Sequence, residues 1–124
     1  MPLYLNIDRL SHTVTVVAHG TITDDEIRDT ARDVLAADVA SYAKILDTTA
    51  ATTQVTPEQI AEIVRLLREG WGDVARGPIA CVVDPRRPGF PRSFAEQSHG
   101  DWPISLFNSL REARAWIERT RAER

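Results

Sequence analysis

Residues 77–85 have the sequence GPIACVVDP, and this stretch decides the fold class of the chain. Five apolar residues, Ile79 to Val83, stand between the turn-forming pairs Gly77-Pro78 and Asp84-Pro85. A short apolar run bounded by glycine and proline is typical of a strand that is buried on both faces of a sheet. Parallel sheets covered by helices contain such strands, so the segment predicts an α/β protein.

The segments before this strand alternate between strand and helix patterns. Residues 3–7 alternate apolar and polar side chains, and residues 13–18, TVTVVA, are rich in β-branched residues, so together they predict an opening hairpin. Helices are predicted to begin at residues 23–26, TDDE, and at residues 56–59, TPEQ, because each is a capping box. Between these helices, residues 44–47, KILD, predict a short buried strand.

The segments after the strand continue the alternation. Residues 85–91 contain three prolines and a glycine, so we expect an irregular loop there. A short helix over 93–98, a strand over 104–107 and a final helix capped by Ser109 are predicted to follow. The predicted fold class is α/β, in the order β-β-α-β-α-β-α-β-α. It has a mostly parallel sheet with an antiparallel opening hairpin, and helices packed on the sheet. All 124 residues, 1–124, are expected to form a single domain.

The composition restricts the class of protein. Hydrophobic residues make up 43% of the chain and charged residues 27%, which excludes disorder as the main state. No apolar run approaches the ~20 residues of a membrane helix, and residues 1–10 lack the pattern of a signal peptide, so we expect no membrane insertion. A single cysteine, Cys81, excludes an internal disulfide and indicates a cytoplasmic protein without a metal site. The net charge of -3 argues against nucleic-acid binding.

Polar side chains follow several of the predicted parallel strands. In open α/β sheets, ligands bind beyond the carboxyl ends of the strands. The candidate contact residues for a ligand or partner at these ends are Asp47, Thr48, Asp84, Arg86, Arg87 and Arg92. The two aspartates could bind Mg²⁺ or act in acid–base chemistry, but an aspartate at a strand end more commonly bonds its own turn. The arginines could pair with a carboxylate or phosphate, or they could be solvated loop charges.

Catalytic signatures are absent from the sequence. Cys81 lies among apolar neighbours, which favours an inert core thiol. His12, His19 and His99 have no metal-ligand spacing to one another or to the cysteine. The chain contains neither a nucleophile elbow nor a glycine-rich loop for phosphate or dinucleotide, so no catalytic residue and no cofactor are predicted.

Nearly the whole chain resembles the STAS-like domains (sulfate-transporter and anti-sigma-factor-antagonist), in their stand-alone bacterial, SpoIIAA-like branch. The resemblance rests on residues 20–26, GTITDDE, at the end of the hairpin, and on residues 45–47, ILD. It also rests on Thr56 at the start of a helix and on residues 89–96, GFPRSFAE. This resemblance implies a four- or five-stranded sheet packed by helices, no cofactor and usually no catalysis.

The resemblance also implies a role for Thr56. In anti-sigma-factor antagonists, a serine or threonine that opens the second helix is phosphorylated and controls partner binding. Thr56 stands at that place and is therefore a candidate phospho-acceptor. The sequence departs from the family pattern, because Val55 replaces an aspartate and Pro57 replaces a small hydroxyl residue. The alternative is that Thr56 serves only as a helix cap.

These observations favour a non-enzymatic regulatory or binding module that acts through an unknown protein partner or a small ligand. The alternative is an enzyme for a small-molecule or lipid-like ligand that uses Asp47, Asp84 and Arg92 at the strand ends. A more distant resemblance to the CRAL-TRIO lipid-binding fold implies an apolar ligand between the helices and the sheet.

Large apolar side chains near the ends of the predicted elements suggest a homodimer. A chain of 124 residues has difficulty in burying all of them, and exposed apolar patches often mark association surfaces. The equal alternative is that these side chains close the ends of the core. The residues concerned are Trp71, Phe90, Phe94 and Trp102.

Overall fold

The computed structural model describes residues 3–87 and 89–123. Its elements are β1 (Leu3–Asp8), β2 (Thr13–Ile22), α1 (Asp24–Ala36), β3 (Ala43–Thr53), α2 (Pro57–Trp71), β4 (Ile79–Val82), α3 (Gly89–Gln97), β5 (Ile104–Phe107) and α4 (Leu110–Ala122). This order confirms the predicted α/β fold. None of the helices in the described part of the chain is long and apolar enough to cross a membrane.

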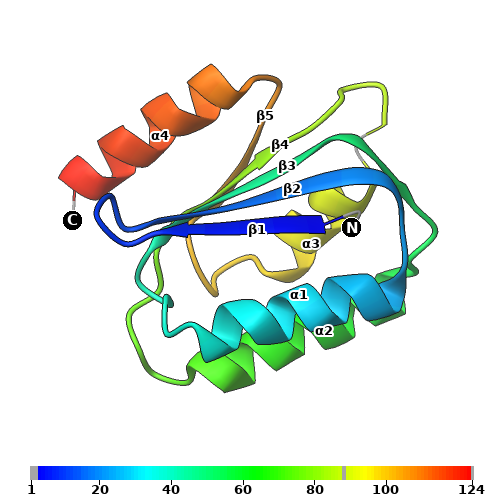
Figure 1. Cartoon of the computed structure of the whole chain (residues 1–124), viewed down its shortest axis with the longest axis horizontal. Coiled ribbons are helices and arrows are strands. Elements are labelled where there is room, and N and C mark those ends of the chain that lie inside the picture. Colours follow the sequence, from blue (N-terminus) through cyan, green and yellow to red (C-terminus); the bar gives the residue numbers. More distant parts are fainter. Residues whose placement is uncertain (1–2, 88, 124) are drawn as a thin grey trace.

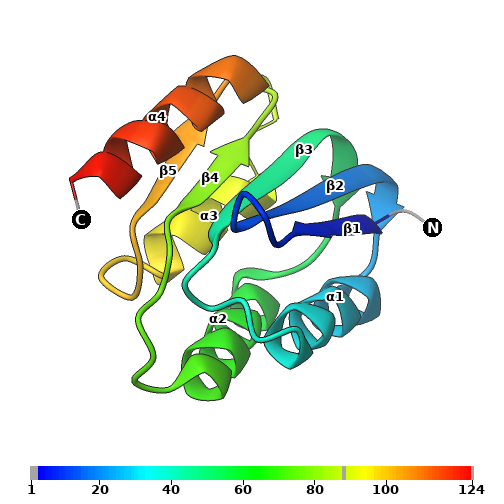
Figure 2. The same ribbon diagram turned by 60° about the vertical axis from the view of Figure 1, so that its left-hand side comes forward.

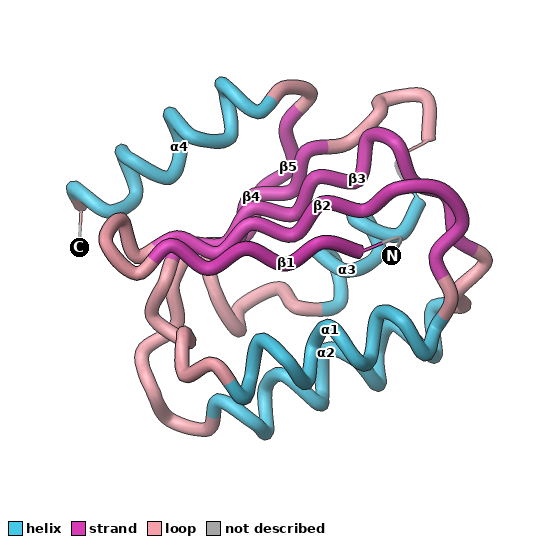
Figure 3. Tube along the Cα trace, in the orientation of Figure 1, coloured by secondary structure: helices cyan, strands magenta, loops and turns pink. Residues whose placement is uncertain are grey.

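The strands form one mixed sheet in the order β1-β2-β3-β4-β5 (Figure 1). β1 pairs with β2 in antiparallel orientation, and the other neighbouring strands are parallel. Helices α1, α2 and α3 cover one face of the sheet, and α4 covers the other face (Figures 1 and 2). Figure 3 shows β1 at the open edge of the sheet, next to β2.

The hydrophobic core is split between these two faces. The larger part lies between the sheet and α1, α2 and α3, and it includes Ile60 and Ile63 of α2 and Cys81 of β4. The smaller part lies under α4, where Ala113 and Ile117 pack on Ala43, Ile45, Ala80 and Val82 of the sheet. Successive residues of a strand face opposite sides of a sheet, so β3 and β4 contribute to both parts. The apolar run over 79–83 is therefore buried on both faces, as predicted.

The aromatic residues that suggested a homodimer are mostly inside the core. Trp71, Phe94 and Trp102 are each buried. The two tryptophan rings meet edge to face at 5.3 Å between centroids, and Phe94 lies 6.2 Å from Trp102. Phe90 is half-buried and stacks on Phe94 at 5.8 Å. The expectation that burial of these side chains would be difficult was wrong, because they pack on one another where α2, α3 and the 98–103 loop meet.

Strands β2 and β3 are longer than the sequence indicated. β3 was predicted over 44–47, but it runs from Ala43 to Thr53, and β2 extends to Ile22. β4 pairs with β3 only up to Asp47, so beyond this point β2 and β3 form a two-stranded extension of the sheet, residues 19–22 paired with 50–53. The register between the two strands shifts at residues 17–19, where the extension begins.

Helix α3 begins earlier than predicted. The sequence indicated an irregular loop over 85–91, but Gly89, Phe90 and Pro91 already belong to the helix. Proline is tolerated in the first turn of a helix because the N–H that it lacks has no partner within the helix there. Ser93 is consequently not an N-cap, and its hydroxyl accepts a hydrogen bond from Gln97 at 3.3 Å. Pro88, which was part of the predicted loop, lies outside the described residues.

Candidate functional site

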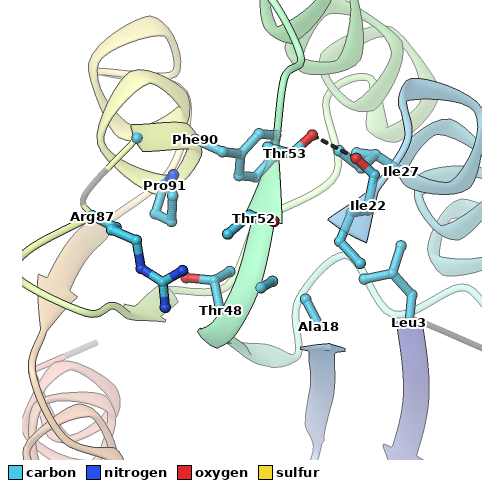
Figure 4. Close-up of a pocket in the computed structure, with 12 residues that line it drawn as sticks. Leu3, Ala18, Ile22, Ile27, Thr48, Thr52, Thr53, Arg87, Phe90 and Pro91 are labelled. Atoms are coloured by element: carbon cyan, nitrogen blue, oxygen red, sulfur yellow. Dashed lines mark hydrogen bonds between the residues drawn. The ribbon is translucent and has the colours of Figure 1, made fainter. Parts of the chain in front are cut away.

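The carboxyl ends of β2 and β3 border a pocket of about 230 Å³, which we call the edge pocket (Figure 4). One wall is the two-stranded extension, and the facing wall is the turn before α3 together with the first turn of that helix. The lining residues from the chain's first third are Leu3, Ala18, Ile22 and Ile27. The remaining lining residues are Thr48, Ala51, Thr52, Thr53, Arg87, Gly89, Phe90 and Pro91.

Two of the three threonines that line this pocket donate hydrogen bonds to backbone carbonyls. The Thr48 hydroxyl donates to the carbonyl of Val82 at 3.0 Å, and the Thr53 hydroxyl donates to the carbonyl of Ile22 at 2.6 Å. Their remaining atoms add apolar surface to that of the aliphatic residues. The pocket therefore has a mainly apolar lining with few free donors, a composition that suits the apolar body of a small molecule.

Arg87 brings a positive charge to one end of the edge pocket. A tight turn holds it, since the Arg87 amide donates to the Asp84 carbonyl at 2.8 Å. The Arg87 guanidinium also contacts the Asp84 carboxylate, with 3.5 Å between Nη2 and Oδ2. Figure 4 shows the side chain extending toward Thr48, with Leu3 and Ile27 at the opposite end of the pocket. The pocket is thus polar at one end and apolar at the other.

Arg86 donates most of the hydrogen bonds that the Asp84 carboxylate accepts. Its Nε and Nη2 each donate to the carboxylate at 3.2 Å, and its backbone amide donates at 3.0 Å. The side-chain bond from Arg86 is the largest influence on Asp84, and it lowers the pKa of this carboxyl below the usual value. Asp84 is therefore an ionised turn residue at neutral pH, and a lowered pKa does not suit a general acid.

The other predicted charged residues lie away from the edge pocket. Asp47 accepts hydrogen bonds from the amide and hydroxyl of Thr49, at 3.2 and 2.8 Å. Its neighbour in the sheet is Val82, which belongs to the core under α4, so Asp47 faces the opposite side of the sheet from Thr48. Arg92 is exposed on α3 and pairs with Glu96 at 3.4 Å. Of the predicted contact residues, the structure brings only Thr48 and Arg87 together in the pocket.

A second cavity of about 100 Å³, which we call the inner cavity, lies between the sheet and α1 and α2. Leu3 and Ile27 line both cavities, so the two are neighbours. The inner walls are almost entirely apolar and include Val16, Ile63 and Phe94. Lys44 also borders the inner cavity, and its ammonium donates to the carbonyls of Ala40 and Tyr42 at 2.7 and 2.8 Å.

The other side chains considered for chemistry are the possible metal ligands and the thiol of Cys81. Within the described ranges, no group of three or more His, Cys, Asp or Glu side chains could hold a metal ion. Burial raises the pKa of the Cys81 thiol to about 12, which keeps it protonated and unreactive at neutral pH.

Thr56 has the geometry of a helix cap. Its hydroxyl accepts a hydrogen bond from the Gln59 amide at 3.2 Å, and the Gln59 side chain accepts one from the Thr56 amide at 2.9 Å. This reciprocal pair is the capping box that the sequence predicted for α2. The side chain is exposed and lies outside the lining of the edge pocket.

Sequence reasoning did not identify the apolar half of the site. Phe90 was expected to take part in a dimer contact, and nothing in the sequence indicated that Ile22, Ile27 and Phe90 together line a cavity. One usable signal was the Thr- and Ala-rich run over 48–53, because small residues after an apolar strand leave room beside the backbone. The position of Phe90 and Pro91 depended on the early start of α3, which the proline pattern concealed.

The fold of the chain is found in a solved structure, although no family match accompanies it. No protein-family model matches the chain, and no curated protein matches it either. Among solved structures, the chain is similar to an uncharacterized protein of the DUF3478 family from Shewanella loihica PV-4, whose crystal structure has a SpoIIAA-like fold. The match has a TM-score of 0.63, covers 93% of each chain and has 15% sequence identity. The chain therefore has the SpoIIAA-like α/β fold that its sequence predicted.

Proposed function

We propose that this chain is a non-enzymatic binding module that holds a small ligand in the edge pocket. The observation that carries the proposal is the pocket itself, at the carboxyl ends of parallel strands where α/β sheets commonly bind ligands. Its volume of about 230 Å³ exceeds the ~150 Å³ of an engineered apolar cavity that binds benzene. Its lining favours a molecule with a largely apolar body.

The separate positions of the candidate catalytic residues support the non-enzymatic part of the proposal. Acid–base catalysis requires groups within hydrogen-bond reach of one reacting atom. Asp47 is bonded to Thr49, Asp84 to Arg86 and Arg92 to Glu96, each on its own segment of the chain. A ligand in the edge pocket would meet Arg87 and Thr48 but neither aspartate among the lining residues.

The experiment is a titration of the protein with a neutral, mainly apolar probe, 1-octanol. Binding is measured by isothermal titration calorimetry. We expect saturable binding to the natural chain and a loss of binding in Ala51→Phe, because Ala51 lines the edge pocket and a phenyl ring there would fill it. The matched control is Ala50→Phe. Ala50 is the adjacent, exposed residue of β3 and does not line the pocket.

The two variants separate site binding from general hydrophobic adsorption. Octanol binding that Ala50→Phe retains and Ala51→Phe loses supports the edge pocket as the site. Equal binding by all three proteins, or no saturable binding by the natural chain, contradicts the proposal. Thermal unfolding of each variant verifies that a loss of binding does not come from a loss of the fold.

A further inference from the structure

We infer that the ligand of the edge pocket is an amphiphilic anion, whose charged group binds Arg87 and whose apolar chain extends toward the inner cavity. This inference rests on the proposed function. It starts from the unequal ends of the pocket, with Arg87 and Thr48 at one end and Leu3 and Ile27 at the other (Figure 4). A neutral apolar ligand would leave the arginine unused, whereas an amphiphile matches both ends.

The charges around Arg87 leave it available to an anion. Asp84 carries one negative charge and faces two guanidinium groups, so the three side chains together are positive. Arg86 satisfies the carboxylate through two side-chain bonds at 3.2 Å, and Arg87 adds a single contact at 3.5 Å. Arg87 can therefore turn to a ligand without leaving the Asp84 carboxylate unpaired. Its side chain is 54% exposed, so this movement meets little steric resistance.

The backbone near Arg87 favours the same sign of charge. Gly89 and Phe90 line the pocket and belong to the first turn of α3, a helix of nine residues. The first N–H groups of a helix have no partner within it, and the helix dipole places partial positive charge at this end. Anions are stabilised in such positions, so the helix supplements the guanidinium.

The apolar chain has a path away from Arg87. Leu3 and Ile27 line both the edge pocket and the inner cavity, so a chain that extends along them reaches the space walled by Val16, Ile63 and Phe94. The ammonium of Lys44, at the inner cavity, is already held by two carbonyl oxygens and lies 4.7 Å from the Trp71 ring. The anionic group is therefore expected at Arg87, and the chain at the inner cavity.

The test compares decanoate with 1-decanol, which have the same chain length and differ in charge. Binding is measured at pH 7.5 by calorimetry and by intrinsic tryptophan fluorescence, to which Trp71 at the inner cavity contributes. We expect decanoate to bind about tenfold more tightly than decanol, because hydrogen bonds to charged groups are stronger than those to neutral groups. From hexanoate to decanoate, each added methylene should tighten binding about fourfold.

Arg87→Gln and Arg92→Gln form the matched pair of variants, since each removes one exposed guanidinium near the start of α3 and only Arg87 lines the pocket. Arg87→Gln should remove the preference for decanoate and leave decanol binding intact, and Arg92→Gln, which does not touch Asp84, should keep the preference. Equal affinity for decanoate and decanol in the natural chain overturns the inference, and so does a preference that survives Arg87→Gln. In both cases decanol still binds, so the proposed function stands. If neither compound binds, the proposed function itself fails.

Discussion

Substitution of Thr56 distinguishes a structural role of this residue from a regulatory one. The structural role predicts a loss of folding stability whose size can be estimated. Thr56→Ala removes the hydrogen bond that the hydroxyl accepts from the Gln59 amide at 3.2 Å. The return bond from the Thr56 amide to the Gln59 side chain, at 2.9 Å, does not involve the hydroxyl and remains. Loss of an N-cap costs ~0.5–2 kcal/mol, and this cap is exposed, so we expect a loss of about 1 kcal/mol.

The assay is thermal and urea unfolding of Thr56→Ala, Thr56→Ser and Thr56→Asp. For a domain of this size, 1 kcal/mol corresponds to a fall in Tm of about 4 °C. Serine and aspartate also cap helices, and aspartate suits the positive end of the helix dipole, so these variants should stay within about 0.5 kcal/mol of the natural chain. An unchanged Tm in Thr56→Ala, or an equal loss in Thr56→Asp, would refute the capping interpretation.

The chain provides an internal standard for this measurement. Thr23 caps α1 in the same way, accepting from the Glu26 amide at 3.2 Å, and its hydroxyl also donates to the Glu26 carboxylate at 2.9 Å. Thr23→Ala should therefore cost more than Thr56→Ala, because it removes an additional bond to a charged group. A larger loss of stability in Thr56→Ala than in Thr23→Ala would show that these side-chain hydrogen bonds are not what makes the caps stabilising.

Phosphorylation of Thr56 would change binding more than stability. The added phosphate, with about -1.5 to -2 charges, would stand at the N-terminus of α2, where negative charge is favourable. The helix would keep its fold, and the new charge would act on whatever contacts this exposed end. Mass spectrometry of the protein purified from its own host tests this: a modified Thr56 assigns the residue a regulatory role, and an unmodified residue leaves it a cap.

Three further predictions concern packing, pH and thiol chemistry. Gly77→Ala should destabilise the fold by about 3 kcal/mol, because a Cβ there would stand 2.2 Å from the Tyr42 carbonyl oxygen; a urea midpoint like that of the natural chain would contradict this. Arg68 lowers the pKa of Asp101, so the stability from this pair is complete above the unfolded pKa of about 3.9 and is lost as pH falls through the lower folded pKa. In Asp101→Asn the decline of the urea midpoint at acid pH should be shallower, and an identical decline would exclude the pair as its source. Cys81, whose pKa burial raises to about 12, should resist a thiol reagent at pH 8 until urea unfolds the chain, whereas rapid labelling of the folded protein would show that the strand opens.

The element order could be predicted because several local signals agreed with the final packing. The capping boxes at Thr23 and Thr56 form as the sequence indicated, and so does the cap at Ser109. The apolar run over 79–83 is typical of a strand covered on both faces, and β4 forms over Ile79–Val82. These features depend on a few neighbouring residues, and such signals are the ones that a sequence displays directly.

The edge pocket depends on contacts between distant segments, which local patterns do not contain. The 48–53 run has no apolar stripe, and it becomes strand because β2 continues beside it and provides hydrogen-bond partners. Pro91 looked like a helix breaker, although its position in the first turn of α3 makes its missing N–H harmless. The sequence named Arg87 as a candidate together with Arg86 and Arg92. Only the structure shows that, of these three, Arg87 lines the cavity.

The unequal lengths of the strands divide β3 into two halves of different local stability. Residues 44–47 are bonded to β2 on one side and β4 on the other, whereas residues 50–53 are bonded only to β2. Amide hydrogens of the outer half therefore exchange with solvent at a lower opening free energy than those of the inner half. The outer half is also a wall of the edge pocket, so the least protected part of the sheet is the part that a ligand would touch. A ligand held there would slow exchange over 50–53 more than over 44–47, which makes the sheet itself a reporter of occupancy.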